Sequence, residues 1–297
     1  MSEKRSAQRG RVMFLFLAAS QVVSALGTGL ALFAIQWELW TRLESGLALA
    51  ALWVFVAIPY IVLGPIAGVC VDRWDRRKIL LGSDLFSGLV TAVAVLGMSI
   101  DHAPVPLLYV VASGVSCCNS FHGPALQSSI PRLIPRSRLA RANSFLEFGM
   151  QSSRILAPAF GGLLLAAGWS AAHLLPLAAL SFLSAALSLV FVRIPFPKVS
   201  QRGEEADQER KVTLLSDLSG GVRFLRSQRA LLLLMMLAAI VFLGSGLNVL
   251  IPQLVTQVFQ GGPRLFGMME ASLSGGALLG SVILLMWGDL SEEPRGS

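Results

Sequence analysis

The stretch GVCVDRWDRRK, from Gly68 to Lys78, begins with the last four residues of an apolar run that starts at Leu47, and it ends in a cluster of basic residues. A helix that crosses the hydrocarbon layer of a membrane needs about 20 apolar residues, and residues 47–71 form an uncharged run of 25. Four of the seven residues after this run are Arg or Lys. The stretch therefore predicts a transmembrane helix that ends in a cationic turn at the membrane surface.

The composition extends this prediction to the whole chain. Hydrophobic residues make up 54% of the sequence and charged residues 14%, and the mean hydropathy is +0.68. In soluble domains about 25% of the residues are charged. Eight apolar windows have the length of a membrane span, namely residues 12–36, 47–71, 79–100, 105–121, 142–168, 171–192, 230–258 and 265–287. The sequence therefore predicts an all-α polytopic membrane protein.

The basic residues predict the orientation of these spans. If the N-terminus lies in the cytoplasm, 21 of the 24 Lys and Arg residues fall in cytoplasmic segments. Arg42 and Arg264 fall outside, and Arg154 lies within a span. Because basic residues strongly favour cytoplasmic loops, a multi-pass protein with both termini in the cytoplasm is predicted. These loops account for the net charge of +7, so no nucleic acid partner is expected.

Three regions are predicted along the chain. Residues 1–192 hold six spans and form an N-terminal transmembrane half, residues 193–229 form a polar cytoplasmic linker, and residues 230–297 hold two further spans. Apolar residues of the linker recur at helical spacing between basic residues, which indicates a short amphipathic helix on the membrane surface. They are Leu214, Leu215, Leu218, Val222 and Leu225.

The turn after the second span resembles a signature of the major facilitator superfamily, whose members have twelve helices in two halves of six. The matching residues are Gly68, Asp72, Arg73, Arg76, Arg77 and Lys78. Asp75 stands where the family usually has Gly, and with Trp74 it resembles the branch of macrolide efflux proteins and the enterobactin exporter. The resemblance implies a six-helix N-terminal half, two helices of a C-terminal half, and a location in the bacterial plasma (inner) membrane.

Electrostatics offers a reason for this signature. Asp72 is expected at the C-terminus of a helix, where the helix dipole disfavours an anion, so it needs a cationic partner. Arg73, Arg76 or a basic residue of the 132–141 loop is the candidate, and Gly68 is expected to let a neighbouring helix approach. The resemblance implies that the turn gates transport. The alternative is that its charges only fix the orientation in the membrane.

A second resemblance lies in the fifth span, where antiporters of this family carry a glycine pattern around a Gly-Pro pair. The corresponding residues here are Ser144, Ser153, Ala157, Pro158, Gly161 and Gly162. Each departure replaces glycine by another small residue, so close helix packing is retained, and Pro158 is expected to kink the span. The resemblance implies export coupled to inward proton flow. A plain packing groove is the alternative.

Ionisable residues within spans are costly and are often functional. The four here are Asp84, Glu147, Arg154 and Glu270. The three carboxylates lie about five residues from a span end, so we expect them to reach the interface. Arg154 lies near the midplane and must face the protein interior or a water-filled cavity, with Glu147, Gln151 or Gln21 as its partner. It either lines a central cavity or ties helices together.

A polar stripe runs along the first span through Gln21, Ser24, Gly27 and Thr28. Such a stripe either lines a translocation path or joins helices. We expect joining for Ser24 and Gly27, and a place in the cavity wall for Gln21. The candidate cavity and coupling residues are therefore Gln21, Asp84, Glu147 and Arg154.

No constellation for metal, cofactor or covalent chemistry emerges from the sequence. His102, His122 and His173 are isolated, the three cysteines lack metal or disulfide spacing, and there is no phosphate-binding loop. An enzyme is therefore not expected. The main hypothesis is a secondary transporter of amphiphilic small molecules such as macrolides or siderophores, with the lipid bilayer, the small molecule and protons as partners. The alternatives are a non-transporting scaffold or regulatory fragment, and a membrane enzyme.

The resemblance covers the whole chain, yet the last predicted span is the eighth of the family's twelve. A truncated transporter, a partial chain, and one part of a split transporter completed by a separate polypeptide are the alternatives. Because transporters of this kind rock one half against the other, we expect the 297-residue chain alone not to export. Small residues of the last two spans are expected to face lipid, namely Gly244, Gly246, Gly275, Gly276 and Gly280.

Overall fold

The computed structural model describes residues 2–101, 104–192, 228, 231–234, 236–237 and 249–289. The chain divides into two compact units, one with Met1–Ile194 and Leu250–Ser297 and the other with Pro195–Val249. In the described part of the second unit, residues 231–234 and 236–237 are helical. The predicted amphipathic helix of the 193–229 linker lies outside the described residues, as do Gly244 and Gly246.

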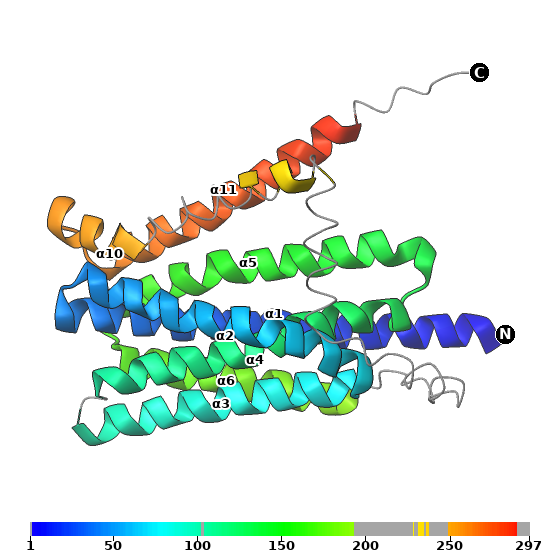
Figure 1. Ribbon diagram of the computed structural model, residues 1–297, viewed down its shortest axis with the longest axis horizontal. Helices are drawn as coiled ribbons and strands as arrows, with labels where there is room; N and C mark the ends of the chain where they lie inside the picture. The colour runs from blue at the N-terminus through cyan, green and yellow to red at the C-terminus, as the bar shows by residue number, and fades with distance from the viewer. Residues whose placement is uncertain are drawn as a thin grey trace. The chain divides into compact units, whose positions relative to one another are not determined.

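The first unit is built from helices, and the described residues contain no strand. The long helices are α1 (Ser2–Leu43), α2 (Gly46–Arg73), α3 (Arg76–Asp101), α4 (Val105–Leu133), α5 (Leu139–Ala166), α6 (Ala171–Phe191) and α11 (Pro263–Asp289) (Figure 1). The short ones are η1 (Arg136–Arg138), α10 (Ile251–Gln253) and the π-helix η3 (Leu254–Val258). Every long helix overlaps a predicted span, so the predicted all-α fold class is confirmed.

α4 is longer than the sequence predicted, because it continues from residue 121 to Leu133. Polar residues such as His122 and Ser129 end the apolar window in the sequence, but packing buries both of them. Pro124 and Pro131 lie within the helix, which continues through them. The predicted end was wrong because a run of apolar residues does not measure which polar residues are buried.

Five described helical segments are long and apolar enough to cross a membrane. They are Gly10–Leu43, Gly46–Val71, Arg76–Met98, Val105–Leu133 and Ala171–Phe191. α5 and α11 have the length of a span, with 28 and 27 residues, but they are not among these five. α5 carries the charged side chains Arg141, Glu147 and Arg154.

α1 lies at the centre of the bundle and packs against α4, α5 and α6 (Figure 1). α3 packs on α4 and α6, α2 packs on α4, and α11 packs on α5. The N-terminal ends of α1, α3 and α5 meet the C-terminal ends of α2, α4 and α6 in a hydrophobic core, where Leu17, Leu80, Ala125 and Leu189 are almost completely buried. The α2–α3 turn with its basic residues lies in the chain between two residues of this core, Val71 and Ile79.

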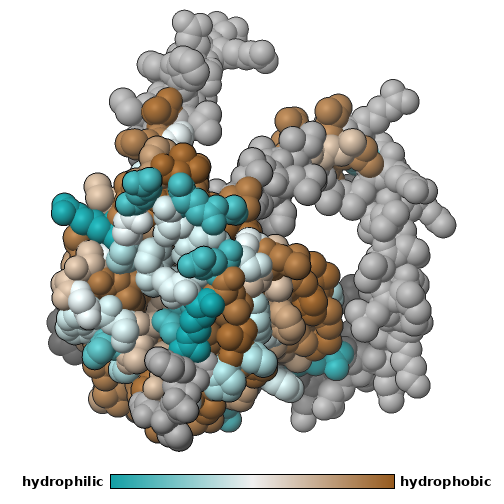
Figure 2. Space-filling model, turned by 90° about the vertical axis from the view of Figure 1, so that its left-hand side faces the viewer, coloured by the Kyte–Doolittle hydropathy of each residue, from teal (hydrophilic) through white to brown (hydrophobic). Residues whose placement is uncertain are grey.

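The outer surface of the bundle is apolar along its flanks. Figure 2 shows the end of the bundle where α1 finishes, with hydrophilic residues gathered on the end and hydrophobic residues beside it. Large apolar side chains such as Ile61, Leu89 and Leu180 are more than half exposed. Soluble proteins rarely expose apolar surface on this scale, so the outer surface fits a lipid environment.

Candidate functional site

Local hydrogen bonds build the turn between α2 and α3. α2 ends at Arg73, where the N–H of Trp74 bonds back to the last turn. α3 begins at Arg76, and the Asp75 carboxylate accepts a hydrogen bond from the Arg77 N–H at 3.0 Å. An acidic side chain in this place caps a helix and suits its dipole. Asp75, which departs from the usual glycine, therefore has a structural role that the sequence did not reveal.

The basic residues of the turn lie in different surroundings. Arg77 donates from Nε to the Leu189 carbonyl at 3.0 Å and from Nη2 to the Val190 carbonyl. It thereby caps the C-terminus of α6, where a cation also suits the helix dipole. Arg76 is buried, with 6% of its surface exposed. Arg77 therefore fastens the start of α3 to the end of α6.

Two expectations for this turn have different outcomes. Asp72 lies in the last turn of α2, as expected, but its side chain is outside the described part, so its cationic partner stays a prediction. No described atom lies within 4 Å of the place that a Cβ on Gly68 would occupy. The expected close approach of a helix at Gly68 is therefore not found, because α2 packs on α4 elsewhere along its length. Arg73 and Lys78 are exposed.

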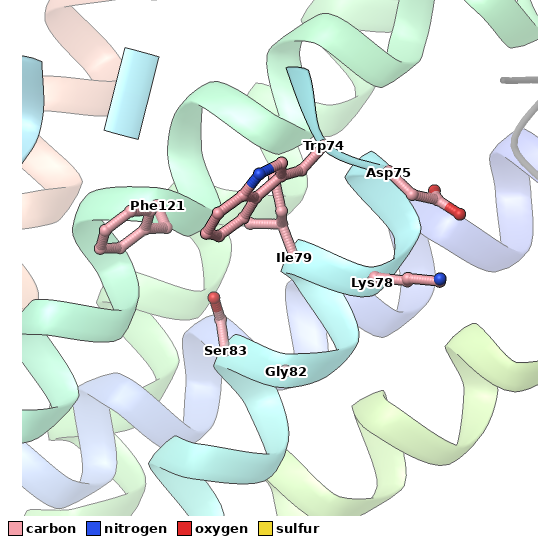
Figure 3. Close-up of a pocket in the computed structure, with 7 residues that line it drawn as sticks. All are labelled: Trp74, Asp75, Lys78, Ile79, Gly82, Ser83 and Phe121. Atoms are coloured by element: carbon pink, nitrogen blue, oxygen red, sulfur yellow. The ribbon is translucent and has the colours of Figure 1, made fainter. Parts of the chain in front are cut away.

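A cavity of about 500 Å³ lies beside the turn (Figure 3). Figure 3 shows the Trp74 ring extending towards Phe121 of α4, with Ile79 beside the Trp74 ring. The side chains of Asp75 and Lys78 point away from these rings. The other lining residues are Gly82 and Ser83. The cavity therefore has apolar walls and a charged edge next to the predicted gating turn.

The small residues of α5 form a packing surface against α1. The Ser153 hydroxyl donates to the Val22 carbonyl of α1 at 3.0 Å. A Cβ on Gly161 would stand 2.6 Å from the Phe33 ring, and the Ala157 methyl would meet a Cβ on Gly29 at 2.6 Å. These residues recur every four positions on α5, so they form one stripe along the helix. Small side chains are what such close contact between helices requires.

Two further residues of the same motif face α11. A Cβ on Gly162 would stand 2.7 Å from the Pro263 carbonyl oxygen and 2.9 Å from the Cα atom of Gly267. A Cβ on Gly267 would in turn collide with the Pro158 carbonyl oxygen. The backbones of α5 and α11 therefore touch at this crossing. Ser144 does not belong to it, since Ser144 is exposed and donates to the carbonyl of its own helix at 3.0 Å.

Aromatic side chains join the same crossing to α1. The Phe266 ring of α11 stacks on Phe33 with centroids 4.8 Å apart and on Trp37 with centroids 5.4 Å apart. Trp40 of α1 donates from Nε1 to the Thr256 hydroxyl of η3 at 3.1 Å. α11 and η3 therefore contact the six-helix half through α1 as well as α5.

Arg154 and Glu147 are both exposed on α5. Within the described residues, Arg154 forms no ion pair, and the Glu147 carboxylate accepts a hydrogen bond from Gln151 at 3.0 Å. The Glu147–Arg154 pair that the sequence allowed is therefore not formed, because Gln151 lies one turn from Glu147.

Asp84 lies inside the bundle and not at the interface, contrary to the expectation from the sequence. Its side chain is 2% exposed, and its Oδ1 accepts a hydrogen bond from the Ser24 hydroxyl of α1 at 2.6 Å. The His122 Nε2 of α4 lies 3.5 Å from the same oxygen. His122 is therefore not isolated: the longer α4 places it among three helices. A fourth span that continues to Leu133 contains His122 as an intramembrane ionisable residue.

Gln21 is also buried in the bundle, and it does not line an open cavity wall. None of its surface is exposed, and its Nε2 donates to the Ser20 hydroxyl at 3.3 Å. Its Oε1 has no hydrogen-bond partner in the described part of the chain. Ser24 joins α1 to α3, as expected for the polar stripe, and Gly27 lies against Ser181 of α6.

The comparisons with known proteins agree with this fold. The family described as "Major Facilitator Superfamily" matches residues 15–296. The chain therefore belongs to the Major Facilitator Superfamily, as the α2–α3 turn indicated.

The relatives include two kinds of transporter. Macrolide efflux protein A of Streptococcus pyogenes is 27% identical over 284 residues, which cover 95% of this chain and 68% of that protein. The Staphyloferrin A transporter of Staphylococcus aureus is 23% identical over 92% of this chain and 66% of that protein. The predicted drug and siderophore efflux branch is thus confirmed at the level of the family.

Two solved structures share the fold. A bacterial homologue of the human lysosomal transporter Spinster, inward-facing and unoccupied, aligns with a TM-score of 0.70 and 18% identity over 92% of this chain and 61% of that one. The D-xylose–proton symporter aligns with a TM-score of 0.59 and 15% identity over 94% of this chain and 69% of that one. The chain spans about two thirds of the length of these proteins.

Proposed function

We propose that this chain takes part in secondary active transport that exports amphiphilic small molecules, such as macrolides or siderophores, across the bacterial inner membrane in exchange for protons. The family match over residues 15–296 carries this proposal. The names of the relatives support it, since one is a macrolide efflux protein and another a staphyloferrin A transporter.

The packing of α5 supports a rocking mechanism. Transporters of this class alternate access by moving one half against the other around a site near the midplane. Here α5 touches α1 through Ser153, Ala157 and Gly161, and it touches α11 through Pro158 and Gly162. In the proposed division, α1 and α5 belong to the half at residues 1–192 and α11 belongs to residues 230–297. The stripe on α5 then forms part of the surface on which the halves move.

The charged side chains of α5 support a cavity for polar parts of the substrate. Arg154 and Glu147 are exposed on one helix, seven residues or about 10 Å apart along its axis. A charge at this depth costs at least about 3 kcal/mol when it faces lipid, so Arg154 belongs at a water-filled surface. In the proposal, Arg154 binds an anionic or carbonyl group of the substrate, and Glu147 binds a cationic one.

The orientation follows the basic residues. In the proposal, both termini and the 193–229 linker lie in the cytoplasm, together with the α2–α3 turn. The Asp72 turn then gates the cytoplasmic side, where the core beneath it closes the bundle.

Transport in everted membrane vesicles tests the proposal. Vesicles from a drug-sensitive bacterium that expresses the chain are given an acidic interior, and the uptake of labelled erythromycin and staphyloferrin A is compared with vesicles that lack the chain. The control subtracts the trapping of erythromycin as a weak base. Against the expectation from the sequence that the 297-residue chain alone does not export, the proposal predicts chain-dependent uptake of at least one probe that a proton ionophore removes. Equal uptake with and without the chain for both probes would refute export, and the chain would then be a non-transporting membrane protein.

A further inference from the structure

A buried acid and a buried base meet where α1, α3 and α4 come together. The Asp84 carboxylate of α3 is held through Oδ1 by the Ser24 hydroxyl of α1 at 2.6 Å. The His122 Nε2 of α4 lies 3.5 Å from the same oxygen, and the two side chains are 2% and 9% exposed. The three residues lie far apart in the sequence, so the tertiary fold creates this site.

The polar atoms of this site are only partly satisfied. Asp84 Oδ2 and His122 Nε2 are buried and have no hydrogen-bond partner in the described part of the chain. A buried, unpaired ion is costly, and burying a polar atom without a partner also costs free energy. Binding of one proton removes the net negative charge of the pair. It also supplies the hydrogen for a hydrogen bond between His122 and Asp84. The geometry therefore favours a site that binds one proton as a unit.

The other titratable groups near the pair are few. Cys118 lies one turn before His122 on α4 and is buried. α1 contributes the neutral residues Ser24 and Gln21 at this depth, and α6 has no titratable residue between 174 and 191. Arg76 precedes Asp84 by about two turns on α3.

The helices that pack on α4 from its other sides add no competing charge to the pair. Glu147 of α5 lies at a similar depth, but its carboxylate is exposed and bonded to Gln151. On α2 the residues level with Asp84 are Pro65 and Ile66, both neutral.

We infer that Asp84 and His122 form the proton-binding site that couples proton entry to export. This inference rests on the proposed function. A proton from outside binds at His122 Nε2, the carboxylate and imidazolium form a neutral pair, and the proton later leaves to the cytoplasm. Because Ser24 joins the pair to α1, which also packs on α5 and α11, the charge change acts on the helices that carry the proposed substrate surface.

Transport measurements separate coupling from binding. The purified full chain in liposomes is assayed in two modes with labelled erythromycin: accumulation driven by a pH gradient, corrected for protein-free liposomes, and exchange for unlabelled erythromycin at equal pH. We expect Asp84→Asn and His122→Gln to lower driven accumulation by about tenfold or more, within the range of allosteric couplings, and to leave exchange within about twofold of the wild type. Glu44→Gln, in the exposed α1–α2 loop, and His173→Gln, which keeps a capping-box residue at the start of α6, are the matched controls.

A spectroscopic test does not depend on transport. In the full chain labelled with ¹⁵N-histidine, the His122 signal is identified by its loss in His122→Gln. We expect His122 to change from neutral imidazole to imidazolium on acidification in the wild type, and to stay neutral in Asp84→Asn, where its charged form loses its partner. Ser24→Ala keeps both titratable groups but removes a donor to the carboxylate, so we expect the pH at which His122 becomes charged to differ from that in the wild type.

The outcomes separate the two proposals. Driven accumulation in Asp84→Asn equal to that in Glu44→Gln would overturn the coupling site while leaving export standing. A His122 titration that is unchanged in Asp84→Asn and in Ser24→Ala would also overturn it. Wild-type chain that moves neither erythromycin nor, in the same assay, staphyloferrin A in either mode contradicts the proposed function, and the histidine spectra then decide whether the pair binds a proton.

Discussion

Single side chains explain why the α2–α3 turn of this chain departs from its family pattern. Asp75 replaces the usual glycine and accepts a hydrogen bond from the Arg77 N–H at 3.0 Å. Arg77 in turn binds the carbonyls at the end of α6. The sequence suggested that the whole run of charges serves one purpose, gating or orientation. The structure instead gives Asp75 and Arg77 individual partners, and such partners cannot be read from spacing.

We expect Asp75→Ala to destabilise the purified chain because α3 loses its N-terminal cap. The expected loss is about 1 kcal/mol in the free energy of unfolding. Asp75→Asn keeps an accepting oxygen and is the matched control, with a smaller loss. Thermal unfolding in detergent measures both, and equal stability of Asp75→Ala and the wild type would show that the hydrogen bond contributes nothing.

Arg154 is the residue on which the proposed substrate surface depends most. We expect Arg154→Ala to abolish erythromycin or staphyloferrin A uptake in everted vesicles while the amount of protein in the membrane stays normal, because a cation exposed at midplane depth is placed to bind substrate. Arg202→Ala, in the 193–229 linker, is the control. Normal uptake by Arg154→Ala at normal abundance would rule out this role.

At the scale of helices, the sequence was informative where apolar residues line a helix and silent where polar residues are buried. The ends of α2 and α6 agree with the apolar windows, since neither window contains an Asp, Glu, Lys or Arg residue. α4 continued past its window through His122 to Leu133, because contacts with α2 and α3 bury its polar residues. The same contacts bring His122 to Asp84. The helix was thus predictable, whereas the Asp84–His122 pair depended on knowing which helices are neighbours.

The small-residue motif of α5 was also predictable only in part. Its small residues predicted close packing, and Ser153, Ala157 and Gly161 do pack on α1. Periodicity could not show that Gly162 faces a different helix, nor that Ser144 faces neither. Those assignments depend on the direction of each side chain around the helix.

We expect Gly267→Ala to displace α11, because the new methyl group would meet the Pro158 carbonyl oxygen and stand 2.9 Å from the Gly162 Cα atom. Overpacking of this kind costs about 1–3 kcal/mol. Gly275→Ala, with no described atom within 4 Å of its new Cβ, is the control and should be neutral or slightly stabilising. Thermal unfolding of both variants measures the difference, and identical melting would mean that the α5–α11 contact is not formed in the membrane.

We expect Asp72→Asn to impair transport more than Arg202→Gln in the 193–229 linker. Asp72 stands at the end of α2, where an anion needs a specific partner, while solvated linker charges are screened within about 10 Å. Uptake in everted vesicles compares the two variants at equal abundance. Equal effects would indicate that the basic turn only sets orientation.

At the scale of the whole molecule, the orientation in the membrane follows from the charges. We expect both termini in the cytoplasm, because 21 of the 24 basic residues then lie on that side. Ser2→Cys and Ser297→Cys, each made in a variant without Cys70, Cys117 and Cys118, are labelled in intact cells with an impermeant thiol reagent. Labelling only after the cells are opened supports the orientation. Labelling of either residue from outside would show that the predicted orientation is wrong.

The central claim is that the chain exchanges an amphiphilic molecule for protons, and the internal pH of liposomes tests it most directly. Purified chain is reconstituted with a pH-sensitive dye inside, and an inward erythromycin gradient is imposed without a pH gradient. Exchange predicts that the interior becomes alkaline faster than in protein-free liposomes, and that Asp84→Asn removes the difference. An interior that acidifies, or that changes at the protein-free rate, would contradict the account.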